Sequence, residues 1–506
     1  MFENQPKGLY ALALANTGER FGYYTMIAVF ALFLRANFGL EPGTAGLIYS
    51  SFLMLVYFLP VIGGLLADMF GYGKMVTTGI MIMFLGYVAL SVPLGGDTTA
   101  LMAMMGALVL ISAGTGLFKG NLQVMVGNLY DDPKYADRRD AAFSIFYMAI
   151  NIGAMFAPTA AVKIMEYAQT QLGVSEADSY HFAFGVACVS LIVSIAIYYA
   201  FRGTFRHTEV SSMSKKRKDG IATDELPAGE TARRVVALIL VFIVVIFFWM
   251  AFHQNGLTLT FFANEFTEKS ASGLQSMAFD VWNLVACIFI VYALFALFQS
   301  KTGRARGIAG GVIAVAVAFL VTRYFMLPES IRLEAPIFQQ FNPCFVVALT
   351  PVSIAIFSWL AKRGKEPSAP RKIAYGMLVA AVAYVIMAIG SMGLLTPNEQ
   401  EAAGDAATLV SPNWLISTYL VLTFGELLLS PMGISFVTKV APPKLKGLMM
   451  GGWFASTALG NFLVSVGGYL WGDLPLWQVW CVFIGLCVLS AGFMFAMMKR
   501  LEKVAK

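Results

Sequence analysis

Inside its first long apolar segment the chain reads Asn16-Thr17-Gly18-Glu19-Arg20-Phe21-Gly22-Tyr23-Tyr24. Charged side chains at membrane depth are costly, so they usually face a helix-bundle interior or a water-filled cavity on a substrate or ion pathway. Helical spacing places five of these residues on one face: Asn16, Glu19, Arg20, Tyr23 and Tyr24. A structural ion pair between two helices would not need two adjacent tyrosines. We therefore expect this face to form one wall of a polar cavity.

The composition is that of a polytopic helical membrane protein. Of the 506 residues, 58% are hydrophobic and only 13% are charged, and the mean hydropathy is +0.72. Apolar runs of about 20 residues recur along the chain, as membrane-spanning helices require, whereas a β-barrel would show short alternating segments. A short polar piece, 1–8, leads straight into the first apolar run without the cut site of a cleavable signal.

Several kinds of partner are not expected from the residue pattern. The five cysteines lie in or beside apolar runs and have no metal-binding spacing, so we expect neither a disulfide framework nor a metal site, and no cofactor. The net charge of +6 is modest. The basic run at 215–218 is typical of a cytoplasmic loop that touches anionic lipid at most, and we expect no binding of nucleic acid.

Fourteen apolar segments can be read along the chain. Their approximate ranges are 8–37, 44–70, 74–95, 100–128, 141–168, 178–201, 233–265, 278–299, 307–327, 340–362, 371–395, 412–438, 446–470 and 475–499. With the N-terminus in the cytoplasm, 28 of the 35 Lys and Arg residues fall in the termini and the cytoplasmic loops. Five lie near the outer side, and Arg20 and Lys119 lie at membrane depth. The excess of positive charge on one side predicts that both termini are cytoplasmic.

The longest polar interruption, 202–232, divides six spans from eight and reads as a flexible cytoplasmic linker. At the cytoplasmic turn after the second span, the sequence Gly63-Gly-Leu-Leu-Ala-Asp68-Met-Phe-Gly-Tyr-Gly-Lys74 resembles the GxLaDxxGxxk signature of the major facilitator superfamily. Its glycines would let helices approach closely, and Asp68 could cap or pair at a helix end. A generic glycine-rich turn is the alternative interpretation.

These features predict an all-α polytopic membrane protein with the major facilitator superfamily fold. The predicted parts are an N-terminal six-helix bundle at 1–201, the linker at 202–232, and a C-terminal six-helix bundle at 233–506 with an inserted helix pair at about 278–327. The turn at 301–306 is basic, so this pair would enter from the outer side and return to it. We expect the pair to serve peripheral packing.

Four further segments carry unusual polar residues. They are Gly116-Leu-Phe-Lys119-Gly-Asn121, Phe143-Ser-Ile-Phe-Tyr-Met-Ala-Ile-Asn151-Ile-Gly-Ala154, Gly425-Glu426-Leu-Leu-Leu-Ser430-Pro431 and Met449-Met-Gly-Gly-Trp453-Phe454. The lone lysine in an apolar helix requires either a nearby anion or a shifted pKa. Together with the first stretch these segments resemble the proton-dependent oligopeptide transporter family. The stretch that begins at Asn16 is similar to its ExxERFxYY motif. The segments that contain Asn151, Glu426 and Trp453 are similar to FYxxINxGA, GELxxSP and MMGxWF, and Gln340-Phe341-Asn342-Pro343 matches as well. The resemblance spans nearly the whole chain.

The resemblance implies a site for a zwitterionic di- or tripeptide. Arg20 and Lys119 would hold the peptide carboxylate, and Glu426 would hold the ammonium group. The middle of the pocket would be lined by Tyr23, Tyr24, Tyr57, Asn151, Asn342, Ser430 and Trp453. Proton coupling would involve Glu19, His253 and Glu426. Ordinary packing is the alternative role for Tyr57 and Trp453, and a structural pairing with Glu19 is the alternative for Lys119.

The chain departs from the family at three positions. Asn16 replaces the first acid of ExxER, Ile27 replaces a basic residue three positions after the tyrosine pair, and His253 replaces a glutamate in the seventh span. In many relatives the latter two positions pair to close one gate, so their joint loss is self-consistent. Two interpretations of His253 remain open. It could supply a titrating group, since its intrinsic pKa is near 6.5, or it could be a neutral hydrogen-bonding residue.

We expect a proton-coupled symporter that imports di- and tripeptides by alternating access, in a bacterial inner membrane and as a monomer. The alternative is a family relative with an altered substrate, such as nitrate or a conjugate, or with proton-independent exchange. An intramembrane enzyme is disfavoured because no Ser/His, paired-Asp or HExxH arrangement occurs at helical spacing. A non-transporting sensor is disfavoured by the charged pocket.

Overall fold

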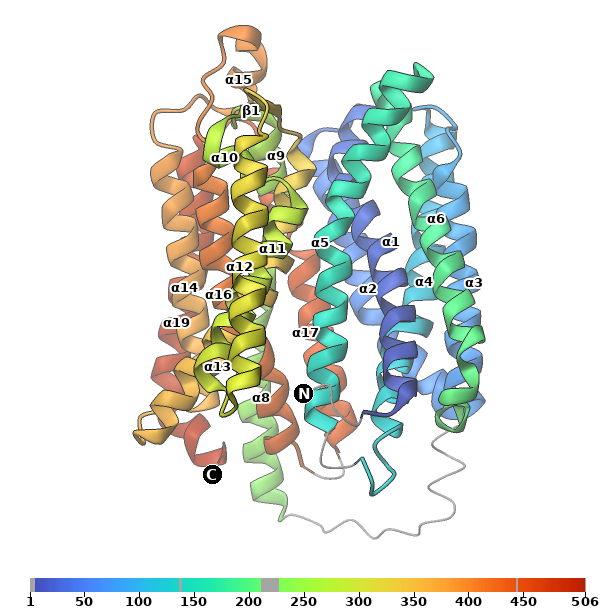
Figure 1. Ribbon diagram of the computed structural model, residues 1–506, viewed down its shortest axis with the longest axis vertical. Helices are drawn as coiled ribbons and strands as arrows, with labels where there is room; N and C mark the ends of the chain where they lie inside the picture. Colours follow the sequence, from blue (N-terminus) through green and yellow to red (C-terminus); the bar gives the residue numbers. More distant parts are fainter. Residues whose placement is uncertain (1–4, 136–138, 211–226, 443–444, 506) are drawn as a thin grey trace.

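The computed structural model describes residues 5–135, 139–210, 227–442 and 445–505. The basic run at 215–218 lies outside these residues. The chain is almost entirely helical, and Figure 1 shows its long helices running roughly side by side. Both termini lie at the same end of the molecule (Figure 1), which we call the terminal side, and the opposite end is the far side.

The first part of the chain forms six long helices. They are α1 (Lys7–Phe38), α2 (Pro42–Phe70), α3 (Tyr72–Ser91), α4 (Thr98–Asn128), α5 (Arg139–Leu172) and α6 (Glu176–Ala200). Local sequence explains several ends. Gly39, at φ 61°, ends α1 in a conformation that other residues rarely adopt. The side chains of Asp97 and Ser175 accept hydrogen bonds from backbone amides at the starts of α4 and α6.

The remainder of the chain is more interrupted. Its longer helices are α8 (Ala228–Phe252), α9 (Thr258–Glu265), α11 (Val281–Gln299), α12 (Gly303–Phe325), α13 (Phe341–Lys362), α14 (Ala369–Gly390), α16 (Asn413–Val440), α17 (Lys446–Phe462) and α19 (Leu476–Ala505). Shorter elements are η2 (Arg202–Thr204), η3 (Arg206–Glu209), η4 (His253–Gly256), α10 (Gly273–Met277), η5 (Ala335–Gln340), α15 (Pro397–Ala403), η6 (Gly404–Ala406) and α18 (Ser465–Tyr469). Two short strands, β1 (Ser270–Ala271) and β2 (Ile331–Arg332), pair antiparallel.

Thirteen helical segments of the described residues are long and apolar enough to cross a membrane. One of them, Gly229–Glu265, contains the 3₁₀ turn η4 between α8 and α9. The predicted segment at 446–470 is not among the thirteen, because it is divided into α17, of 17 residues, and the short α18. The predicted extra pair is present as α11 and α12.

Helices α1–α6 pack mainly on one another, and Figure 1 shows them grouped on one side of the molecule. The tightest crossing is between α2 and α4. A Cβ atom added at Gly63 would collide with the carbonyl oxygen of Gly116, so the glycine of the superfamily signature permits this contact. Asp68 of the same signature accepts a hydrogen bond of 2.6 Å from the hydroxyl of Tyr72.

The second group of helices is built around α14, which packs on α16 and α19, while α8 packs on α17 and α19. The two groups meet where α2 contacts α17 and α18, and where α5 contacts η5 and α13. The α11–α12 pair lies at the edge of the second group beside α13 (Figure 1), where the hydroxyl of Tyr292 donates to the carbonyl of Val347 at 3.1 Å. This arrangement leaves the polar residues of several helices facing the space between the groups.

Candidate functional site

A cavity of about 400 Å³ lies between the two groups of helices. Its volume is within the usual range for small-molecule sites. All ten residues predicted to bind substrate line it: Arg20, Tyr23, Tyr24, Tyr57, Lys119, Asn151, Asn342, Glu426, Ser430 and Trp453. They come from α1, α2, α4, α5, α13, α16 and α17. His253, at the break between α8 and α9, lines it as well.

The cationic part of the cavity contains one paired and one unpaired cation. The side chains of the Glu19–Arg20 ion pair are both buried. The guanidinium of Arg20 donates two hydrogen bonds of 2.5 Å to the carboxylate of Glu19. The ammonium group of Lys119 lies 4.0 Å from the ring centroid of Tyr57, and it has no ion pair among the residues that the structure describes. The alternative in which Lys119 pairs with Glu19 is therefore not realised here, because Arg20 occupies both carboxylate oxygens.

The anionic part of the cavity is Glu426, whose side chain is largely buried. Its carboxylate accepts a hydrogen bond of 3.0 Å from the side-chain amide of Asn342, which also donates to the hydroxyl of Thr423 at 3.0 Å. Within the described parts of the chain, no cation lies at ion-pair distance from this carboxylate. A buried carboxylate with a single amide partner is well suited to a cationic ligand group.

Aromatic rings form the wall between these ends. His253 stacks on Trp249 with ring centroids 5.2 Å apart, and it lies 5.9 Å from the ring of Tyr57. Three buried polar atoms of this lining lack a hydrogen-bond partner in the described structure: Nε2 of His253, Nε1 of Trp249 and Oγ of Ser430. Buried polar groups are normally satisfied, so these atoms indicate where water or polar ligand groups can be accommodated.

The face predicted on α1 is only partly a cavity wall. Arg20, Tyr23 and Tyr24 line the cavity, whereas Asn16 and Glu19 are buried outside the lining, with Glu19 held by Arg20. Ile27 and His253, which stand where many relatives have the charged pair of a gate, both line the cavity. They contribute an alkyl group and an imidazole group to its wall.

Several polar lining residues were missed by the sequence analysis. They are Tyr49, Gln123, Tyr147, Asn255, Gln339 and Thr457. Tyr147 lies within the quoted segment of α5, and Gln339 immediately precedes Gln340, so their positions beside motifs were a usable signal. Asn255 could have been found only from the helix break, because its backbone leaves the regular helix there.

The cavity is closed toward the far side and open toward the terminal side. On the far side, Gln339 donates to the carbonyl of Ala28 at 3.0 Å, and an ion pair joins Arg35 of α1 to Glu265 of α9. Toward the terminal side the lining residues Tyr147 and Ile434 are 43% and 45% exposed. The structure is therefore in a conformation that admits a ligand from the terminal side.

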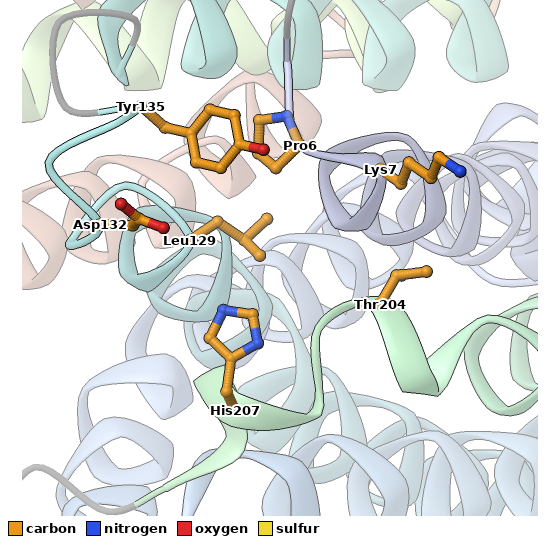
Figure 2. Close-up of a pocket in the computed structure, with 7 residues that line it drawn as sticks. All are labelled: Pro6, Lys7, Leu129, Asp132, Tyr135, Thr204 and His207. Carbon is orange, nitrogen blue, oxygen red and sulfur yellow. The ribbon is translucent and has the colours of Figure 1, made fainter.

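A second pocket, of about 320 Å³, lies on the terminal side and shares no lining residue with the cavity. Figure 2 shows its seven lining residues, from the N-terminal segment, the end of α4 and the η2–η3 region: Pro6, Lys7, Leu129, Asp132, Tyr135, Thr204 and His207. Beside it, Tyr130 donates a hydrogen bond of 2.6 Å to Gln5, and burial raises the pKa of Tyr130 to about 12. These contacts fasten the N-terminal segment, which is a structural role.

The POT family model matches residues 73–222 and 324–470, which is more than half of the chain. The chain belongs to the POT family. It is 30% identical to the peptide transporter YePEPT of Yersinia enterocolitica over 93% of this chain and 89% of that protein. It is also 30% identical to the uncharacterized transporter YclF of Bacillus subtilis, over 94% and 90%.

The fold is shared with solved members of the POT family. A crystal structure of a peptide transporter POT in complex with sulfate matches with a TM-score of 0.74 and 24% identity, over 100% of this chain and 96% of that one. This POT family member is therefore a multi-pass membrane transporter with the major facilitator superfamily fold, and not an enzyme.

Proposed function

We propose that this POT family member is a proton-coupled symporter that imports di- and tripeptides by alternating access. One observation carries the proposal. The ammonium of Lys119 on α4 and the carboxylate of Glu426 on α16 line the same cavity, and neither has an ion-pair partner among the described residues. A ligand with a carboxylate at one end and an ammonium at the other complements both charges.

In this proposal the peptide carboxylate binds Lys119 and reaches Arg20, while the peptide ammonium binds Glu426. Asn151 and Asn342 contact the peptide backbone, and the rings of the lining accept side chains loosely. A neutral sugar would leave both buried charges unpaired, which is unfavourable, so the site disfavours sugars as substrates. Di- and tripeptides share both end groups and differ only in the span between them.

The direction of transport follows from the proposed orientation. The terminal side carries most of the Lys and Arg residues, which supports a cytoplasmic location for both termini. The bacterial origin of the similar transporters supports a bacterial inner membrane. The conformation described above is then closed to the outside and open to the cytoplasm. Import requires the far-side contacts between the two six-helix halves to break and terminal-side contacts to form.

Proton coupling is proposed to act through Glu19 and Glu426, while the imidazole of His253, which contacts aromatic rings and no carboxylate among the described residues, serves as a neutral hydrogen-bonding group. Neutralising Glu19 would release the Arg20 guanidinium, which could then bind the peptide carboxylate. The alternative is transport without protons or of an altered substrate. That alternative is favoured by the replacements Asn16, Ile27 and His253, because asparagine and isoleucine cannot titrate and the pair at positions 27 and 253 is absent.

Uptake of labelled dialanine into liposomes that contain the purified full-length protein tests the proposal. We expect concentrative uptake with an inward proton gradient, competition by unlabelled trialanine, and little uptake with Lys119→Ala. The matched control is Lys163→Ala, which removes an exposed lysine on α5. Competed uptake that ignores the gradient would favour the proton-independent alternative. Absence of any dialanine uptake would contradict the peptide assignment itself.

A further inference from the structure

At the far side, the ends of the inserted helices α11 and α12 are held together by contacts between the segments that flank them and between the helices themselves. Strands β1 and β2, which flank the pair in sequence, join Ser270 to Arg332 and Ala271 to Ile331. Beside them an ion pair connects Asp280, at the start of α11, with Arg323, near the end of α12. The same Asp280 caps α11 by accepting from the amide of Trp282 at 2.8 Å. The two ends of the insertion are therefore held together independently of the rest of the fold.

The far end of α11 contacts a bridge between the two halves. Gln340, at the end of η5, donates from its amide nitrogen to the carbonyl of Phe279 at 3.2 Å. Its amide oxygen accepts from the hydroxyl of Thr159 on α5 at 3.0 Å. The Gln340 side chain is fully buried, and one amide group thus links the insertion to a helix of the first half.

A second contact reaches α5 directly. The ring of Trp282 packs edge-on against that of Phe156 on α5, with centroids 5.4 Å apart. Phe279 also packs on Phe338 and Phe341, which lie in and directly after η5. Gln339 of η5 in turn bonds to the carbonyl of Ala28 above the cavity. The far end of the insertion therefore contacts both η5 and α5, the two elements that meet across the far side at Gln340 and Thr159.

The other end of α11 makes no comparable contact. Phe298, near the terminal side, is 80% exposed, and α12 buries only Ala309 and Ala316. If α11 served only peripheral packing, its two ends would not need to differ so much in the contacts that they make. Among the described residues, the aromatic contact of α11 with the first group of helices is made by Trp282, near its start, with Phe156 of α5.

We propose that the α11–α12 pair stabilises the closed far side of the cavity. In this closed state Phe279 and Trp282 hold η5 against α5. When the far side opens, Trp282 separates from Phe156, and Thr159 leaves Gln340. The α11–α12 pair acts only by positioning η5 and α5, because it does not line the cavity. An aromatic edge-to-face contact favours the closed state by roughly two- to tenfold.

Distances between spin labels across the far side test this proposal. Labels are attached to cysteines placed at Gln171, in the last turn of α5, and at Glu401 on α15, in full-length protein whose five native cysteines are replaced; both label sites are exposed. We expect Trp282→Ala to move roughly two- to tenfold more of the population to long distances. Thr159→Val, which removes only the hydrogen bond and keeps the side-chain shape, should act in the same direction.

The control is Phe298→Ala, an aromatic truncation on the same helix at the exposed end, which should leave the distances unchanged. The proposal is overturned if Trp282→Ala keeps the parent distribution, or if Phe298→Ala shifts it as much as Trp282→Ala does. Should Trp282→Ala not fold, Phe156→Leu, which removes the other ring of the same contact, takes its place. The measurement uses no substrate, so its outcome is independent of whether peptides are transported.

Discussion

Glu426 has a fixed hydrogen-bond donor but no countercharge. Asn342 satisfies one oxygen, and the described residues offer no cation to the carboxylate. The proposed peptide ammonium would supply that charge. Glu426 is also a proposed proton-coupling group. Replacing it tests its contribution to binding the amino terminus of the peptide separately from the contribution of the other lining residues.

We predict that Glu426→Gln raises the KM for dialanine at least about tenfold, because the negative charge that pairs with the peptide ammonium is lost while the shape of the side chain is kept. N-acetyl-dialanine, which lacks the ammonium group, should compete equally with parent and variant. Competition assays in proteoliposomes measure both. Glu166→Gln, at an exposed carboxylate, is the control. An unchanged KM for dialanine would contradict the assignment of Glu426 to the amino terminus.

His253 lies among aromatic rings, and no carboxylate contacts its imidazole in the described structure. This environment favours the neutral hydrogen-bonding interpretation over the titrating one, because nothing stabilises an imidazolium there. We predict that His253→Gln, which keeps a polar group, retains the pH dependence of uptake measured between about pH 5 and pH 8. A flattened pH profile in this variant would restore the titration hypothesis.

Among the helices, the α2–α4 crossing depends on glycines that face the other helix, Gly63 on α2 and Gly116 on α4. Gly63 faces the backbone of Gly116, whereas a Cβ atom added at the adjacent Gly64 would have no heavy atom within 4 Å. We predict that Gly63→Ala destabilises the protein by about 1–3 kcal/mol through overpacking. Gly64→Ala should be neutral. Thermal unfolding in detergent compares the two, and equal Tm values would contradict the importance of this close approach.

The far side is also held by the pair between Arg35 and Glu265, and the indole of Trp471 donates to the same carboxylate at 2.9 Å. Since the family's pair at positions 27 and 253 is absent, we predict that this pair contributes to far-side closure. Because both side chains are partly exposed, the effect should be modest. Arg35→Ala should increase the open population by less than about tenfold.

The charge-swapped double variant Arg35→Glu with Glu265→Arg is the matching control for this prediction. It should recover much of the closed population if the ion pair itself matters. Spin-label distances across the far side measure the populations of parent, single and double variants. A double variant that is as open as Arg35→Ala would assign the effect to packing and not to charge.

At the scale of the whole molecule, the charge distribution predicts which side faces the cytoplasm. In cells, a membrane-impermeant maleimide should label a cysteine at Glu401, on the far side, and should not label one at Lys301, in the basic turn between α11 and α12. The exposed cysteines Cys287 and Cys481 are first replaced by serine. The reverse labelling pattern would overturn the proposed orientation and, with it, the direction of import.

Much of this molecule could be predicted from the sequence, because a membrane restricts the possible structures. Apolar runs near 20 residues must form helices there, since backbone groups cannot bond to lipid. For the same reason a polar residue in such a run is unusual enough to be noticed. Arg20, Lys119, Asn151 and Glu426 were identified in this way, and the structure brings all four to one cavity.

Other features depend on contacts between residues that are distant in sequence. Gln340 bonds to Thr159 across 181 positions, and no local pattern reveals that bond or the closed far side to which it belongs. The pairing of Glu19 with Arg20, and not with Lys119, depends on which side chains the packing of α1 and α4 lets meet. The helices, their polar residues and the family motifs can be read from the sequence, because hydropathy and spacing are local properties. Which charges are paired, which side is closed and what the inserted helices touch depend on how distant segments pack together, and no local pattern carries that information.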